Sequence, residues 1–328
     1  MVKLSPPAFW GNPRARVWPT LLAPFAWGVA ATARGRMRRT GWHAPVPVLC
    51  CGNITVGGTG KTTVVMDLVQ RLIARGRHPH VLTRGYGGHV ADGTRVEPSF
   101  HTARQVGDEP LLLAGYCPVW VGGNRALTAR CAVSAGADCL IMDDGFQNPS
   151  LVKSFSLLVV DGAVGFGNGH VLPAGPLRES VADALVRADA LLVIGADQTG
   201  VEQHCGVLPV VHAELEQVDV PENIRNRPCV AFAGIGRPEK FFTGLRAAGL
   251  GVAEALSFPD HYAYSMRDIE RLEALARRLG APLVTTPKDA MRLPAGFRHS
   301  VVEVGVRLVW QDPQAPEHLL NMFLAQSP

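Results

Sequence analysis

The segment Val48–Thr63 constrains the fold of this chain more than any other. It joins an apolar run to a glycine-rich turn and ends in Gly-Lys-Thr-Thr, where apolar residues begin to recur with helical spacing. Glycines in such a turn adopt backbone dihedrals that other residues avoid, so successive N–H groups can point at phosphate oxygens beside a helix N-terminus. Because strand, turn and helix follow in this order, the segment predicts a phosphate-binding loop of the P-loop type.

The loop residues also predict the ligands. In such a loop Lys61 reaches the β- and γ-phosphates, and the hydroxyl of Thr62 binds Mg²⁺. The strict motif has glycine where this chain has Thr55, and a bare Gly-Lys-Thr also occurs in ordinary loops, but the flanking strand and helix favour the phosphate interpretation. We therefore predict ATP and Mg²⁺ as cofactors, held by Thr55, Val56, Gly57, Gly58, Thr59, Gly60, Lys61, Thr62 and Thr63.

Length and composition predict a globular protein with two domains. The chain has 328 residues, of which 47% are hydrophobic, enough to bury a large core. Its seven cysteines are odd in number, lie mostly in apolar runs and form no Cys-x-x-Cys pair. This pattern indicates reduced core thiols of a cytosolic protein rather than a disulfide framework or a zinc site.

Apolar runs alternate with helical stretches from Pro45 onward, which predicts an α/β fold with a parallel sheet wrapped by helices. The expected strands are 46–51, 80–83, 119–121, 139–142, 157–160 and 191–194. We place this P-loop core at residues 45–220, after an N-terminal segment at 1–44. A smaller α/β unit is expected at 221–328, with strands at 229–232 and 282–285, a helix at 238–248 and a second helix between a capping box at Ser265 and Gly280.

The N-terminal 42 residues carry four of the six tryptophans and seven cations with no acidic residue: Lys3, Arg14, Arg16, Arg34, Arg36, Arg38 and Arg39. Between Arg16 and Arg34, prolines and a glycine interrupt 17 uncharged residues, which is short for a spanning helix of about 20 apolar residues. Aromatic and basic side chains favour the membrane interface. We predict a helix or broken helix lying in that interface. The alternatives are packing on the protein's own core, a true span and a cleaved signal peptide.

Two acidic pairs are candidates for the chemistry. Asp143 and Asp144 follow an apolar run, where a P-loop protein holds Mg²⁺, and adjacent acids are costly without a cation, so a metal is favoured over a solvated turn. Asp108 and Glu109 lie between glycine and proline, which on spacing alone predicts a surface turn. The expected metal ligands are Thr62, Glu109, Asp143 and Asp144. In the long loop at 165–179, Arg178 is the candidate to stabilise a transferring phosphoryl group.

The chain resembles the tetraacyldisaccharide 4'-kinase family, membrane-associated lipid A kinases of Gram-negative bacteria. The resemblance rests on a series of segments that spans nearly the whole chain: Gly-Asn-Ile-Thr-Val-Gly-Gly-Thr-Gly-Lys-Thr (52–62), Arg-Gly-Tyr-Gly-Gly (84–88), Gly-Asp-Glu-Pro (107–110), Asp-Asp-Gly-Phe-Gln (143–147), Phe-Gly-Asn-Gly (166–169), Leu-Pro-Ala-Gly-Pro-Leu-Arg-Glu (172–179), Phe-Ala-Gly-Ile-Gly (232–236), Phe-Pro-Asp-His-Tyr (258–262) and Thr-Thr-x-Lys-Asp-Ala (285–290). The family also has threonine at the position of Thr55. It commonly has histidine where Asn148 stands, and Glu or Lys where Pro287 stands.

The resemblance implies ATP- and Mg²⁺-dependent phosphorylation of the 4'-hydroxyl of a tetraacylated glucosamine disaccharide 1-phosphate, giving a lipid IVA-type product. It implies that Asp108 is the catalytic base and is paired with His261. Because these residues lie in different predicted units, we expect closure of the cleft to assemble the pair. A peripheral, monomeric enzyme at the cytoplasmic face of the inner membrane is expected, bound through residues 1–42.

Two other classes of protein fit parts of the sequence. A membrane-tethered nucleotide switch or assembly ATPase would use the same loop to drive conformational change. A nucleic-acid-binding ATPase is disfavoured, because the excess cations are interleaved with tryptophan at one end and the remaining chain is net acidic.

Overall fold

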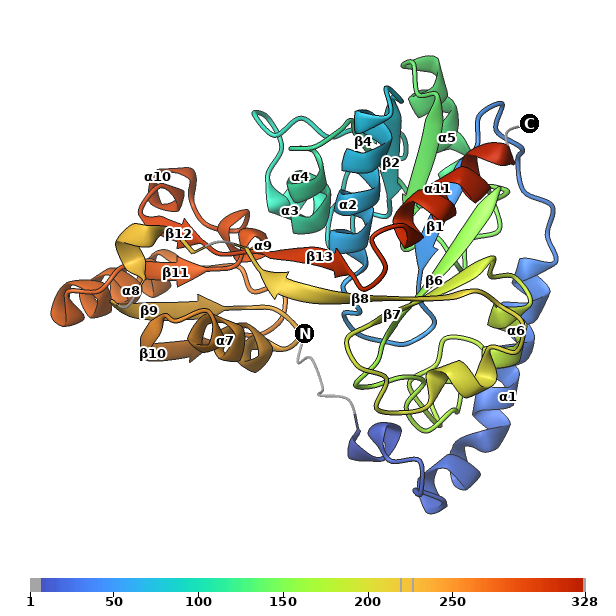
Figure 1. Ribbon diagram of the computed structural model, residues 1–328, viewed down its shortest axis with the longest axis horizontal. Coiled ribbons are helices and arrows are strands. Elements are labelled where there is room, and N and C mark those ends of the chain that lie inside the picture. The colour runs from blue at the N-terminus through green and yellow to red at the C-terminus, as the bar shows by residue number, and fades with distance from the viewer. Residues whose placement is uncertain (1–6, 219, 226, 327–328) are drawn as a thin grey trace.

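The fold is that of a computed structural model, which describes residues 7–218, 220–225 and 227–326. Figure 1 shows a larger α/β unit and a smaller one, with two strands running side by side from the first toward the second. The N-terminal helix lies along the larger unit.

The larger sheet has the strand order β13-β8-β7-β6-β1-β5-β2-β4-β3 in the described part of the chain. Its inner strands run parallel, while β3 and β13 pair antiparallel at the two edges. The first strand, which leads into the phosphate loop, lies between β5 and β6. The strands are β1 (Val48–Gly52), β2 (Pro79–Thr83), β3 (Thr94–Arg95), β4 (Val119–Val121), β5 (Cys139–Asp143), β6 (Phe155–Asp161), β7 (Ala190–Ile194), β8 (Val210–Gln217) and β13 (Val306–Trp310).

Helices cover both faces of this sheet, so its central strands are buried at every position. One face packs against α2 (Lys61–Ala74), α3 (Ala103–Val106), α4 (Asp108–Leu113) and α11 (Ala315–Ala325). The other face packs against α1 (Val17–Met37), α5 (Arg125–Ser134) and α6 (Val181–Leu185). The six strands predicted from apolar runs are all present, which confirms the α/β fold class.

The smaller unit is a parallel sheet of order β10-β9-β11-β12 flanked by helices. The predicted helix at 238 begins with proline, and the predicted capping box at Ser265 is formed before a helix that ends at the left-handed Gly280. The elements are β9 (Pro228–Ala233), α7 (Pro238–Ala247), β10 (Gly251–Ser257), α8 (Met266–Leu279), β11 (Leu283–Thr285), α9 (Pro287–Ala290), α10 (Ala295–Arg298) and β12 (Val301–Glu303).

The expected C-terminal unit at 221–328 needs a correction at its end. Strand β13 returns to the larger sheet and pairs antiparallel with β8 (Figure 1). Helix α11 then buries Leu319, Leu320 and Phe323 in the same core as α2. Strand β13 and helix α11 therefore belong to the larger unit, because their apolar residues share its core with α2.

The N-terminal helix α1 is continuous through Pro24, so of the helix and the broken helix expected there the structure has the unbroken form. Leu22, Ala26 and Ala30 pack toward the core, whereas Leu21 and Phe25 are exposed by 63% and 67%. No helix in the described ranges is long and apolar enough to cross a membrane. The cation Lys3 lies outside the described residues.

Substitutions in α11 test whether the end of the chain stabilises the larger unit. Leu320→Ala should lower the free energy of unfolding by about 2–5 kcal/mol, because it removes buried methyl groups. The control Met322→Ala lies on the exposed side of the same helix and should stay within about 0.5 kcal/mol of wild type. Urea denaturation measures both. Equal losses would mean that α11 does not pack as described.

Candidate active site

The phosphate loop connects β1 to α2 and faces open space. Gly57 and Gly60 have φ of 121° and 84°, in the left-handed region that favours glycine. A Cβ built on Gly57 or Gly58 would meet no atom within 4 Å. The hydroxyl of Thr59 is buried and lacks a hydrogen-bond partner among the described residues. A loop with open glycines and an unpaired buried donor fits a phosphate group.

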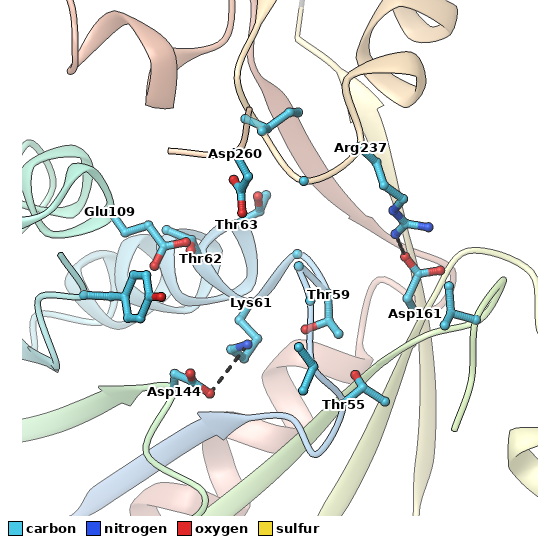
Figure 2. Close-up of a pocket in the computed structure, with 18 of the residues that line it drawn as sticks. Thr55, Thr59, Lys61, Thr62, Thr63, Glu109, Asp144, Asp161, Arg237 and Asp260 are labelled. Carbon is cyan, nitrogen blue, oxygen red and sulfur yellow. Dashed lines mark hydrogen bonds and ion pairs between the residues drawn. The ribbon is translucent and has the colours of Figure 1, made fainter. Parts of the chain in front are cut away.

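Lys61 extends from the start of α2 across the loop. Its Nζ donates to Asn53 Oδ1 at 2.9 Å and lies 3.6 Å from Asp144 Oδ1, as Figure 2 shows for the second contact. The Asn53 amide in turn donates to the Thr55 carbonyl at 2.8 Å. Asn53 therefore orients the lysine, a role that the sequence analysis did not assign.

The acidic pair after β5 lies beside the loop, because β5 pairs with β1 and aligns Asp143 with Cys51. Burial raises the pKa of Asp143 to about 7, and Glu109 adds to the shift while Lys61 opposes it. Asp144 has a φ of 55°. Although burial opposes the change, Lys61 and Arg178 hold the pKa of Asp144 below its ordinary value.

The long loop at 165–179 is tied to the phosphate loop by backbone hydrogen bonds. Val56 N donates to Pro176 O at 2.9 Å, and Arg178 N donates to Ile54 O at 2.7 Å. These bonds bring the Arg178 guanidinium to 3.1 Å from both oxygens of Asp144. Arg178 thus lies beside the acidic pair, in an ion pair with Asp144.

Asp108 begins helix α4 and is only 4% exposed, so the surface-turn prediction for this acid was wrong. Its Oδ2 lies 3.1 Å from His261 Nδ1 and 2.9 Å from Arg292 Nε. Burial opposes ionisation, but the hydrogen bond from His261 and the charge of Arg292 hold the pKa of Asp108 well below its usual range. The carboxylate is therefore ionised at neutral pH.

His261 comes from the smaller unit, in the loop after β10. Its backbone has a φ of 56°, and its N–H donates to the Gly234 carbonyl at 2.9 Å. The hydrogen bond to Asp108 raises the pKa of His261 above its ordinary value, although burial opposes the shift. The ring also contacts that of Tyr86, with centroids 5.8 Å apart.

Three further cations of the smaller unit reach the larger one. Arg292 is 6% exposed and bridges Asp108 and Asp289. Lys288 pairs with Glu109, and Arg237 pairs with Asp161 at the end of β6 (Figure 2 draws the second pair). Sequence reasoning gave none of these a role. Lys288 lies within a segment that carries the family resemblance, whereas no sequence pattern marks Arg292.

One cavity of about 2390 Å³ connects these groups. Its lining includes the phosphate loop, Arg178 and His261, and it extends to Phe25 and Val29 of α1. Charged groups therefore line one part and apolar side chains of the N-terminal helix line another. This division suits a ligand with a polar head and an apolar body.

The predicted metal ligands Thr62, Glu109, Asp143 and Asp144 all offer oxygen. Within the described ranges, no group of three or more His, Cys, Asp and Glu residues is arranged to hold a metal ion by itself. Mg²⁺ in kinases usually takes one or two carboxylates together with substrate phosphates. The oxygen donors therefore fit an ion shared with a nucleotide rather than a preformed protein cage.

A sequence profile of the family described as tetraacyldisaccharide-1-P 4'-kinase matches residues 18–324. The chain belongs to this family. It is 58% identical to the tetraacyldisaccharide 4'-kinase of Gluconacetobacter diazotrophicus, over 97% of this chain and 98% of that protein. The enzyme of the same name from Gluconobacter oxydans is 54% identical over 98% of this chain and 99% of its own length.

The fold also matches a solved structure, LpxK from Aquifex aeolicus in complex with ATP. The TM-score is 0.76 at 26% identity, covering 93% of this chain and 99% of that one. Members of the tetraacyldisaccharide-1-P 4'-kinase family are kinases of lipid A biosynthesis, and this chain is such a kinase. Family membership decides against the nucleotide-switch alternative.

The histidine–aspartate pair predicts a pH dependence of stability. His261 has an ordinary pKa of about 6.5 when unfolded, and Asp108 raises it in the folded protein. The stability that the charged His261 adds to the folded protein is therefore fully present below about pH 6.5, and it is lost as pH rises through the pKa of His261 in the folded state. The stability difference between wild type and His261→Gln should be larger at pH 6 than at pH 9, measured by urea denaturation. A constant difference would mean that the pair is not charged in the folded state.

Proposed function

We propose that this kinase binds ATP with Mg²⁺ at residues 55–63 and transfers the γ-phosphoryl group to the 4'-hydroxyl of a tetraacylated glucosamine disaccharide 1-phosphate. One observation carries the proposal. His261 of the smaller unit contacts Asp108 and lines the same cavity as Lys61 of the larger unit. The ATP bound to the Aquifex aeolicus structure supports the choice of nucleotide.

Cations of the site are placed to neutralise a triphosphate. Lys61 lies at the start of α2, where N–H groups and the helix dipole favour negative charge. Arg178 is held beside it through Asp144 and would stabilise charge on the transferring group. Thr62, Glu109, Asp143 and Asp144 would hold Mg²⁺, which when bound neutralises charge on the phosphate oxygens.

Asp108 would accept the proton of the attacking hydroxyl. The carboxylate stays ionised because Arg292 and His261 contact it. Phosphoryl transfer passes through a loose transition state, so an ionised and well-placed carboxylate suffices even though its pKa is low. His261 would orient the carboxylate and share the charge that develops.

Kinetics of isosteric variants test this role. Asp108→Asn should lower kcat by about 10²–10⁴-fold with little change in the KM for ATP, because a positioned base contributes about that much. The reaction is followed as transfer of labelled phosphate from ATP to the disaccharide lipid. The matched control is Asp260→Asn, which changes the carboxylate 3.7 Å from the other ring nitrogen of His261 and should cost far less. If Asp108→Asn turned over at the wild-type rate, Asp108 would not be the catalytic base.

The exposed face of α1 supports peripheral binding at the cytoplasmic face of the inner membrane. Trp18, Leu21 and Phe25 are each more than half exposed, at helical spacing along one side. A lipid with four acyl chains stays in the bilayer, since each buried methylene contributes about 0.8 kcal/mol. The cavity reaches α1, so the acceptor would enter from the membrane side.

A monomer suffices, because one chain supplies both halves of the site.

Liposome sedimentation tests this surface. Replacing Trp18, Leu21 and Phe25 together by serine should weaken partitioning onto anionic vesicles by at least about tenfold, since a large apolar side chain removed from water contributes about 1.5–3 kcal/mol. The control replaces three apolar residues outside α1 that are each more than 80% exposed, Phe100, Val186 and Val207, by serine. Equal losses in both variants would show that the α1 face is not the membrane contact.

A further inference from the structure

Lys288 places a positive charge between two predicted ligands of the metal. Its Nζ lies 3.5 Å from Thr62 Oγ1 and pairs with Glu109 Oε1. Figure 2 shows the same two oxygen-bearing side chains, Glu109 and Thr62, facing one another beside the phosphate loop. The ammonium therefore contacts the oxygens that a divalent cation would need.

The backbone that carries Lys288 is fixed to the smaller unit. Asp289, which is fully buried, accepts hydrogen bonds from Gly234 N at 2.8 Å and from Tyr264 Oη at 2.6 Å. Thr286 caps the short helix α9 by accepting from Asp289 N. Lys288 thus extends toward the phosphate loop from a backbone that hydrogen bonds hold in the smaller unit. Its contact with Thr62 joins the two units.

Two other acids of the site have their own cations. Asp108 contacts Arg292 and His261, and Asp144 contacts Arg178. Lys288 is the cation in contact with Glu109, and two like charges cannot share the same oxygens without strong repulsion. A metal ion bound to Thr62 and Glu109 therefore requires the ammonium to withdraw.

We propose that Lys288 and Mg²⁺ compete for Thr62 and Glu109, so that metal binding expels the ammonium and releases one contact between the smaller unit and the phosphate loop. This inference rests on the proposed metal ligands. It makes Lys288 a positioning residue, which holds Glu109 toward Thr62 until the metal replaces it.

Mn²⁺ binding to the protein saturated with a non-hydrolysable ATP analogue, measured by electron paramagnetic resonance, tests the competition. Lys288→Met keeps most of the side-chain stem but removes the charge. This variant should bind Mn²⁺ at least about tenfold more tightly than wild type. The size is taken from proton binding, where an adjacent positive charge weakens the affinity of a carboxylate by about 10- to 1000-fold. The matched control Lys240→Met removes a lysine that lines the same cavity from α7 and should leave the affinity unchanged. Equal affinities of wild type and Lys288→Met would overturn the inference.

A second variant separates this inference from the proposed metal site. Adding Thr62→Val to Lys288→Met should abolish the gain in Mn²⁺ affinity. A gain that survives would place the metal away from Thr62 and would count against the proposed ligands as well. If Mn²⁺ binding depends on Thr62 but is unaffected by Lys288→Met, the metal site stands and the competition fails.

Lysine acetylation followed by mass spectrometry reports on Lys288 directly. In wild-type protein, saturating Mn²⁺ should increase the acetylation rate of Lys288 relative to that of Lys240, because the expelled amine loses its carboxylate partner. Unchanged or lower reactivity of Lys288 would show that the ammonium stays in place beside the metal.

Discussion

The contact of α4 with the smaller unit holds the two halves of the candidate active site together. Asp108 and Glu109 begin that helix, and the smaller unit meets them with His261, Lys288 and Arg292. Buried charges are costly unless each has a partner. The acids of one unit and the cations of the other therefore favour a single arrangement, in which His261 and Lys288 of the smaller unit line the same cavity as the phosphate loop.

The strand order of the larger sheet explains why the acidic residues lie beside the phosphate loop. Because β1 lies between β5 and β6, the phosphate loop, Asp143 and Asp161 all emerge at the same edge. Each strand end at this edge has a short sequence pattern, in which an apolar strand is followed directly by glycine or an acidic residue. For that reason the phosphate loop, the acidic pair and the parallel sheet could all be predicted from the sequence.

The features that could not be predicted depend on partners distant in sequence. On spacing alone Asp108 predicted a surface turn, because glycine and proline flank it. Only the family resemblance indicated its pairing with His261, 153 positions away, and contacts of this kind bury it. Arg292 has no local pattern at all. Likewise β13 and α11 were assigned to the smaller unit, since their apolar spacing indicates that they are buried but not which core buries them.

Helix α1 links this charged centre to the apolar part of the cavity. Its inner side, with Ala26 and Ala30, packs on the core, while its outer side carries Leu21 and Phe25 in solvent. Arg34 fixes the helix to the body through Asp183 at 3.2 Å. Because Phe25 and Val29 of α1 line the cavity, the packing of this helix on the core determines how much apolar surface the cavity presents beside its charged groups.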